Sequence, residues 1–242
     1  MEAEGRGEQG RAGEAPVVLC HDGGQFGKYC SVFTASYKGT VLTLISAPSS
    51  CGKLFVLGGD CSIFHMLAGT SCGVAATDVV WSYDPILRLW DRRASMLVPR
   101  VNFACCVLEG KIIVAGGFNN LRQPTSKAEI YDPEKDVWVQ LPDLPYTHHS
   151  GCSGVVVGDK FHVLHKGCSK VLVLENPCRE WAIKDYGWLD SPMAMSVVGG
   201  ELYVLNKRVI FKQNKEGRLQ KVAAAVQHHL MPSTIMVDWG LR

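Results

Sequence analysis

The sequence predicts an all-β protein built from about four copies of a unit of four antiparallel strands. Three observations support this fold class: a pattern recurs after 48 residues, apolar runs of strand length fill each copy, and turn-forming residues separate the runs. "LFVLGGD" is followed by "VVWSYDPILRLW", and "IIVAGGF" is followed by "AEIYDPEKDVW". Asp84 to Asp132 and Trp90 to Trp138 share the same spacing, so the chain contains two copies of one structural unit.

The second copy indicates how one unit is built. Its predicted strands are "FACCVLEG", "KIIVAGG", "KAEIYDP" and "VWVQLP", separated by Glu-Gly, Gly-Gly and Asp-Pro turns. Gly116 and Gly117 permit a positive φ and a close backbone approach, and Asp132 begins the last turn. Tyr131 and Trp138 supply large rings that one sheet presses against the next. Because a lone sheet leaves both faces uncovered, its neighbours are expected to be further copies packed radially, as in a β-propeller.

The repeat signature weakens toward the C-terminus. Repeats are predicted at residues 51–100 and 101–150, followed by a degenerate repeat at 151–192 and an incomplete one at 193–242. Lys166-Gly167 replaces the glycine pair of the third copy, and Phe211 takes the tyrosine position of the fourth. The residues that carry the signature are Gly58, Gly59, Tyr83, Asp84, Trp90, Gly116, Gly117, Tyr131, Asp132, Trp138 and Trp181.

The first 50 residues do not fit the repeat. Residues 1–16 contain four glycines and alternating charges, which predicts a disordered tail. Residues 17–50 stay unassigned, although their runs "SVFTASY" and "TVLTLIS" are candidates for extra strands that supply a missing strand of the array.

A glycine pair, then Tyr-Asp-Pro, then tryptophan seven residues after the tyrosine resembles the signature of kelch-repeat β-propellers. The sequence around this signature closely resembles that of the plant F-box/kelch-repeat proteins, which are substrate receptors of SCF ubiquitin ligases. The resemblance covers residues 52–211 and includes "ATDVVWSYDPILRLWDRRASMLVPRVNFACCVLEGKIIVAGGF", "CSGVVVGDKFHVLHKG" and "IKDYGW". It implies a non-enzymatic module in which the kelch part holds a client protein and an F-box docks on the ligase.

Two features depart from that family. Residues 1–50 contain no recognisable F-box, and the length after residue 50 holds four repeats where kelch propellers usually have about six blades. We therefore expect a partial ring, from a truncated, alternatively spliced or mispredicted form of a longer protein. Such a form would bind a client without docking on the ligase core. The client, the closure of the ring and the oligomeric state are left open.

The alternative is a metal-dependent kelch enzyme or a specifier protein. A copper oxidase needs histidines that converge on one face, and His162 and His165 do not clearly do so. The iron site of specifier proteins uses an E-x-x-x-D-x-x-x-D spacing, whereas Glu129, Asp132 and Asp136 are three and then four residues apart. We expect no enzymatic activity, no cofactor and no metal site.

Composition limits the partners. The formal net charge of +2 gives no long-range attraction for nucleic acid or an anionic membrane, and no run of 18 apolar residues predicts a membrane helix. The ten cysteines form no C-x-x-C pair, and no apolar signal segment follows the N-terminus. These features favour a protein partner and a reducing compartment, the cytoplasm and/or the nucleus.

Client binding is expected on the loops, which are variable connections on a rigid frame. The loops at residues 60–78 and 119–127 join second to third strands, and those at 96–102 and 144–151 join repeats. Some of the candidate residues also have a structural explanation. Arg100 could equally bridge neighbouring sheets, and Lys127 could be a solvated charge. His148 and His149 could belong to a polar outer rim. The candidate client-binding residues are Arg100, Asn119, Asn120, Arg122, Lys127, His148 and His149.

Overall fold

The structure is a computed structural model that describes residues 33–37, 40–47, 50–59, 76–175, 180–185, 192, 194–198, 200–206, 209–214 and 218–224. The predicted all-β class is confirmed, because the described elements are 17 strands in antiparallel sheets. The described part of the chain contains no helix long and apolar enough to cross a membrane. The predicted tail at residues 1–16 lies outside the described residues.

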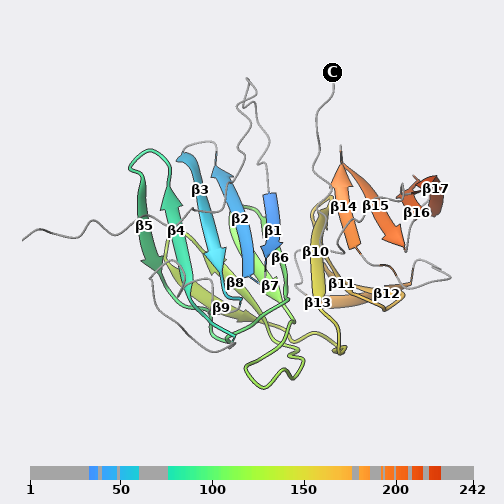
Figure 1. The fold of residues 1–242 in the computed structure, drawn as a ribbon, viewed down its shortest axis with the longest axis horizontal. Coiled ribbons are helices and arrows are strands. Elements are labelled where there is room, and N and C mark those ends of the chain that lie inside the picture. The colour runs from blue at the N-terminus through green and yellow to red at the C-terminus, as the bar shows by residue number, and fades with distance from the viewer. Residues whose placement is uncertain are drawn as a thin grey trace, which may run out of the picture.

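The strands form four sheets, each a meander whose strands follow the chain order (Figure 1). Sheet 1 contains β1 (Phe33–Tyr37), β2 (Thr40–Ala47), β3 (Ser50–Leu57), β4 (Val80–Asp84) and β5 (Leu89–Arg93). Sheet 2 contains β6 (Ala104–Leu108), β7 (Lys111–Ala115), β8 (Ala128–Asp132) and β9 (Val137–Leu141). Sheet 3 contains β10 (Cys152–Val157), β11 (Lys160–His165), β12 (Lys170–Glu175) and β13 (Glu180–Asp185). Sheet 4 contains β14 (Ala194–Val198), β15 (Glu201–Asn206), β16 (Val209–Gln213) and β17 (Leu219–Ala224).

Two details differ from the predicted repeats. Sheet 1 has five strands, and its first two come from the unassigned stretch before Cys51, so the first unit begins earlier than predicted. Sheet 4 has four strands, although the last repeat was predicted to be incomplete. β1 and β2 carry no signature motif, and sheet 4 has neither a glycine pair after its second strand nor Tyr-Asp-Pro after its third, so pairing with a neighbouring strand completes each sheet without the signature.

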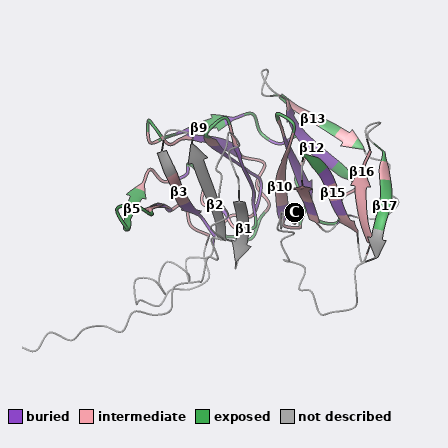
Figure 2. Cartoon of the chain, turned by 90° about the horizontal axis from the view of Figure 1, so that it is seen from above, coloured by how far each residue is buried: buried purple, intermediate pink, exposed green. Residues whose placement is uncertain are grey.

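The interior consists of three apolar cores, one between each pair of successive sheets. The first core joins β3 and β4 to sheet 2, the second joins sheet 2 to sheet 3, and the third joins sheet 3 to sheet 4. The outer strands β5, β9, β13 and β17 carry much of the exposed surface (Figure 2), whereas β7, β11 and β12 are largely buried. The sheets therefore pack face to face along the chain and present their loops at the strand ends.

The signature aromatic residues perform this packing. Tyr131 and Trp138 lie opposite each other on β8 and β9, with ring centroids 4.9 Å apart, and both are buried against sheet 1. The indole nitrogen of Trp138 donates to the carbonyl of Ala94, at the end of sheet 1, over 2.8 Å. Trp181 donates in the same way to the carbonyl of Pro142, at the end of sheet 2. One tryptophan thus joins sheet 2 to sheet 1, and another joins sheet 3 to sheet 2.

Turn chemistry also follows the signature. The carboxylate of Asp132 accepts hydrogen bonds from the backbone N–H groups of Glu134 and Lys135, which fixes the β8–β9 turn. Gly117 has a φ of +89°, and a Cβ there would lie 2.6 Å from the carbonyl oxygen of Val101. The second glycine of the pair is therefore required by both conformation and close backbone approach.

Candidate functional site

The candidate site is one rim of the sheet array, made by loops that meet where β7, β9 and β11 end. We define the rim by the connections at residues 94–103, 116–127, 142–151 and 166–169. Backbone hydrogen bonds link these connections: Cys152 N–H donates to the carbonyl of Asn102, and Lys166 N–H donates to the carbonyl of Gly151. All seven predicted client-binding residues lie in these connections: Arg100 in 94–103, four residues in 116–127, and the two histidines in 142–151.

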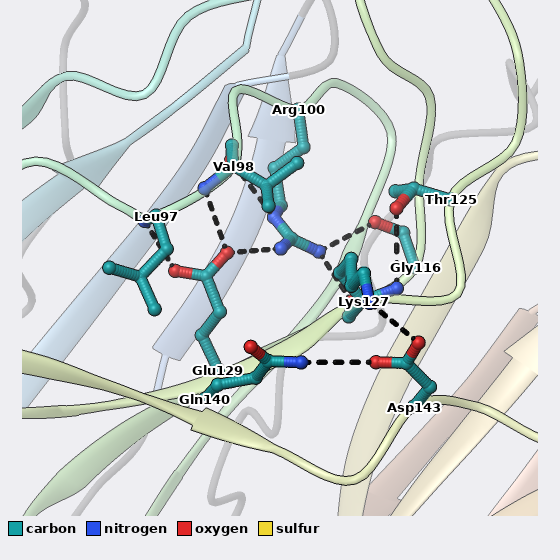
Figure 3. Close-up of polar contacts among 9 residues, drawn as sticks. All are labelled: Leu97, Val98, Arg100, Gly116, Thr125, Lys127, Glu129, Gln140 and Asp143. Carbon is teal, nitrogen blue, oxygen red and sulfur yellow. Dashed lines mark hydrogen bonds and ion pairs between the residues drawn. The ribbon is translucent and has the colours of Figure 1, made fainter.

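Arg100 lies beneath the rim and is fully buried. Its guanidinium donates to the carbonyl oxygens of Gly116 at 2.9 Å and Lys127 at 2.8 Å, and pairs with the carboxylate of Glu129 (Figure 3). Because every one of these acceptors belongs to sheet 2, the side chain fastens the 94–103 connection to that sheet. Arg100 thus takes the bridging role, and its charge is not presented to a client.

Glu129 completes this buried pair. Its carboxylate also accepts hydrogen bonds from the backbone N–H groups of Leu97, at 2.6 Å, and Val98, at 3.1 Å. Burial lowers the pKa of Arg100 from its usual value, and the facing Glu129 carboxylate opposes this shift, so the guanidinium stays charged. From the sequence, Glu129 was considered only as a possible metal ligand, and its pairing with Arg100 was not predicted.

The loop at residues 119–123 is held by the side chain of Asn119. Its oxygen accepts from the backbone N–H groups of Leu121 and Gln123, both at 2.9 Å, and its amide donates to the side chain of Gln123 at 3.2 Å. The backbone of Arg122, with a φ of +57°, donates to the carbonyl of Asn119. Asn119 is therefore occupied within the loop and makes the loop rigid rather than contacting a partner.

The tip of this loop is exposed. Asn120 and Arg122 are exposed, as predicted for residues that reach a client. Between them Leu121 is 75% exposed, the highest value among the described exposed large apolar side chains. Leu121 was missed by the sequence analysis, although an apolar residue inside the polar loop "NNLRQ" is the signal that identifies it. A single exposed apolar residue is common on protein surfaces, but this one stands on a loop held by its own hydrogen bonds, between exposed polar residues, where it is accessible to a partner.

Lys127 and Asp143 form an ion pair at 2.8 Å on the same rim (Figure 3). Their side chains are 43% and 39% exposed, so the pair contributes little stability. The hydrogen bond from Lys127 lowers the pKa of the Asp143 carboxyl, and partial burial opposes this shift. Because Asp143 balances its charge, Lys127 is a weaker candidate for client binding than Arg122.

His148 and His149 are exposed at the neighbouring 142–151 connection. The Nδ1 atom of His148 lies 2.9 Å from the hydroxyl of Ser150, and its ring lies 6.4 Å from that of His165. These two histidines can offer hydrogen bonds to a partner, as can Asn120 and Arg122. These four exposed candidate residues thus come from two different connections, 116–127 and 142–151.

A buried Cys–His pair lies behind the rim. The Nδ1 atom of His165 is 3.2 Å from the sulfur of Cys152, and its Nε2 atom is buried without a partner among the described residues. Burial lowers the pKa of His165 to about 4 and raises the pKa of Cys152 to about 11. His162, also buried on β11, has its pKa lowered to about 4 for the same reason. All three groups are therefore neutral at neutral pH, which suits a packed core.

These histidines predict acid sensitivity. The pKa of about 4 that each histidine has in the folded chain lies below the ordinary histidine pKa of about 6.5, so the unfolded chain binds more protons between these values and stability falls as pH decreases through that window. At pH 5 the expected loss is about 2 kcal/mol for each histidine relative to pH 7.5. Urea denaturation at the two pH values measures it, and the variants H162F and H165F should each remove about half of the dependence. Equal stability at both pH values would contradict this account.

The acidic residues considered as metal ligands serve other roles. Glu129 binds Arg100, Asp132 caps a turn, and Asp136 accepts from the hydroxyl of Tyr131 at 2.6 Å and from the backbone N–H of Ala94 at 2.9 Å. Within the described residues, no three His, Cys, Asp or Glu side chains are grouped so that they could hold a metal ion.

Comparison with known proteins agrees with the sheets and their signature. Residues 99–145 match the family model described as Kelch motif. The chain is 53% identical over 184 residues to the F-box/kelch-repeat protein SKIP30 of Arabidopsis thaliana, covering 76% of this chain and 51% of that protein. It is 32% identical over 183 residues to the Arabidopsis F-box/kelch-repeat protein At1g67480, covering 72% and 46%. The chain thus spans about half the length of these relatives.

A solved structure supports the fold. The structure of YjhT superimposes with a TM-score of 0.56 at 14% identity and covers 81% of this chain and 84% of its own, a likeness that concerns the fold alone. The chain therefore has the fold of a kelch-type β-propeller, and residues 99–145 carry a Kelch motif. Within that class it closely resembles the plant F-box/kelch-repeat proteins over the region that they share.

Proposed function

We propose that this chain is a non-enzymatic protein-recognition module that selects a client for an SCF-type ubiquitin ligase. The observation that carries the proposal is the rigid 119–123 loop, which displays Leu121 between the exposed side chains of Asn120 and Arg122. An apolar anchor with polar neighbours on a preformed loop keeps the entropy cost of binding low. The relatives, named F-box/kelch-repeat proteins, support the link to the ligase.

The rim indicates how the client is held. Leu121 would enter an apolar pocket of the client, while Arg122 and the exposed histidines His148 and His149 would supply hydrogen bonds and positive charge around it. The buried Arg100–Glu129 pair would contribute indirectly by fixing the base of the loop through Gly116 and Lys127. We further propose that the protein works in the cytoplasm and/or the nucleus, which a fluorescent fusion would test.

Affinity capture with quantitative mass spectrometry tests the client site. Against the unmodified chain, L121A should reduce recovery of a defined client at least about fivefold, the effect of losing one interface anchor. The matched control is V139A, since Val139 is 54% exposed on the outer strand β9, away from the rim. Equal recovery with all three chains would contradict the proposed site.

The role in the ligase needs a separate measurement. Fusing an F-box to this chain should lower the abundance of the captured client in a proteasome-dependent manner, and the L121A fusion should not. If the client binds but its abundance is unchanged by the fusion, then recognition stands and the link to ubiquitination is wrong.

A further inference from the structure

The Trp90 position at one end of the array lacks the contact made by its counterparts. Trp138 and Trp181 each donate the indole N–H to a carbonyl of the preceding sheet, at 2.8 Å in both cases. Trp90 occupies the same position on β5, yet it is 48% exposed and donates to no residue that the structure describes, whereas Trp138 is 6% exposed. The ring of Tyr83 lies 5.0 Å from it, in the arrangement of Tyr131 and Trp138. The packing motif is thus formed but has no preceding sheet among the described residues.

Exposed apolar side chains lie near this tryptophan. Ile86 and Leu87 in the β4–β5 turn are each 65% exposed, and Tyr83 lies opposite Trp90 on the same face of the sheet. We call Tyr83, Trp90, Ile86 and Leu87 the Trp90 surface. Leu89 is also exposed, but as the strand neighbour of Trp90 it lies on the other face and is not part of this surface.

The opposite end of the array has the complementary surface. In sheet 3, Leu164 and Val171 pair across β11 and β12 and are fully buried against sheet 4. Leu205 and Ile210 pair in the same register across β15 and β16 of sheet 4, but they are only half-buried. With the neighbouring Tyr203 they form what we call the Ile210 surface.

We propose that the Trp90 surface of one copy of this chain packs on the Ile210 surface of a second copy. Each internal interface already joins these two kinds of surface, because the aromatic face of one sheet covers the aliphatic face of the sheet before it. One chain carries both surfaces, and two chains joined head to tail can close with twofold symmetry. The pair then contains twice the four sheets of one chain, at the upper end of the usual range of about 4–8 propeller blades.

Sedimentation velocity on the purified chain across the micromolar range tests the proposal. We expect a concentration-dependent dimer whose dissociation constant rises about thirtyfold or more in W90A, the loss typical of a central tryptophan. W90F keeps the ring but removes the N–H donor, so it should weaken the dimer only about fivefold. V139A, at an exposed position of another outer strand, should leave the dimer unchanged.

A mixing experiment tests the head-to-tail arrangement. I210K should weaken dimerisation at least as much as W90A does, because either variant disrupts both contacts of a closed pair. A mixture of W90A with I210K should associate again, since the mixed pair keeps one intact contact between the Trp90 surface of one chain and the Ile210 surface of the other. Thermal unfolding of each variant verifies that it is folded.

Three results would overturn the proposal. The chain could remain a monomer throughout the range, or form a dimer that W90A does not weaken. Alternatively, hydrogen exchange could show residues 86–92 protected in a monomer, which would mean that another segment of the same chain covers Trp90. Failure of client capture by the rim would leave this proposal intact, because the two surfaces share no residue.

Discussion

Replacing Arg100 with alanine is expected to lower the free energy of unfolding by about 3–5 kcal/mol. The change leaves the Glu129 carboxylate buried without its counter-ion, and it removes the hydrogen bonds from Arg100 to the buried carbonyl oxygen of Gly116 and to that of Lys127, which keeps the N–H of Gly116. Equilibrium denaturation in urea measures the effect. The matched control is K127A, which breaks a half-exposed ion pair and should cost no more than about 1 kcal/mol.

A double replacement separates the charge effect from the loss of packing. Arg100→Met combined with Glu129→Leu removes both charges, so it should destabilise the chain less than Arg100→Ala alone. If Arg100→Ala costs no more than K127A, then the buried pair does not hold the 94–103 connection on sheet 2.

The second large effect is expected at Trp138. Trp138→Ala should destabilise the chain by about 3–5 kcal/mol, because it empties a buried ring site between sheets 1 and 2 and removes the hydrogen bond to Ala94. Trp90 occupies the same repeat position but is half exposed, so W90A should cost about 1 kcal/mol or less in dilute solution. Urea denaturation of both variants at low protein concentration provides the comparison. Equal costs at the two positions would contradict the assignment of Trp138 to an interface and Trp90 to an end.

The sequence predicted the sheets well where the signature is intact. The 48-residue spacing places Tyr83 and Tyr131 in equivalent strands, and the structure pairs them with Trp90 and Trp138 in the same register. Periodicity is informative there because each strand, turn and ring recurs at fixed positions. Periodicity did not assign β1 and β2 to a unit, because they carry no signature and were expected only as candidate extra strands; they join sheet 1 because β2 pairs with β3 and β1 pairs with β2.

The site could be predicted only in outline. Loop positions follow from strand ends, so the exposed residues Asn120, Arg122 and His148 were found. The partnership of Arg100 with Glu129 was not, because it joins two repeat units and depends on how one sheet packs on the next. Leu121 was missed for a related reason: its exposure depends on the hydrogen bonds of Asn119, which a local pattern does not show.

Photocrosslinking tests the central claim, recognition of a client through the rim, most directly. A photoreactive amino acid is placed in the chain at Leu121, and in a second chain at the exposed control position Val139 on β9. After irradiation in cells, we predict a discrete crosslinked protein from position 121 that is absent from position 139. No product at position 121, or the same products from both positions, would contradict recognition through the rim.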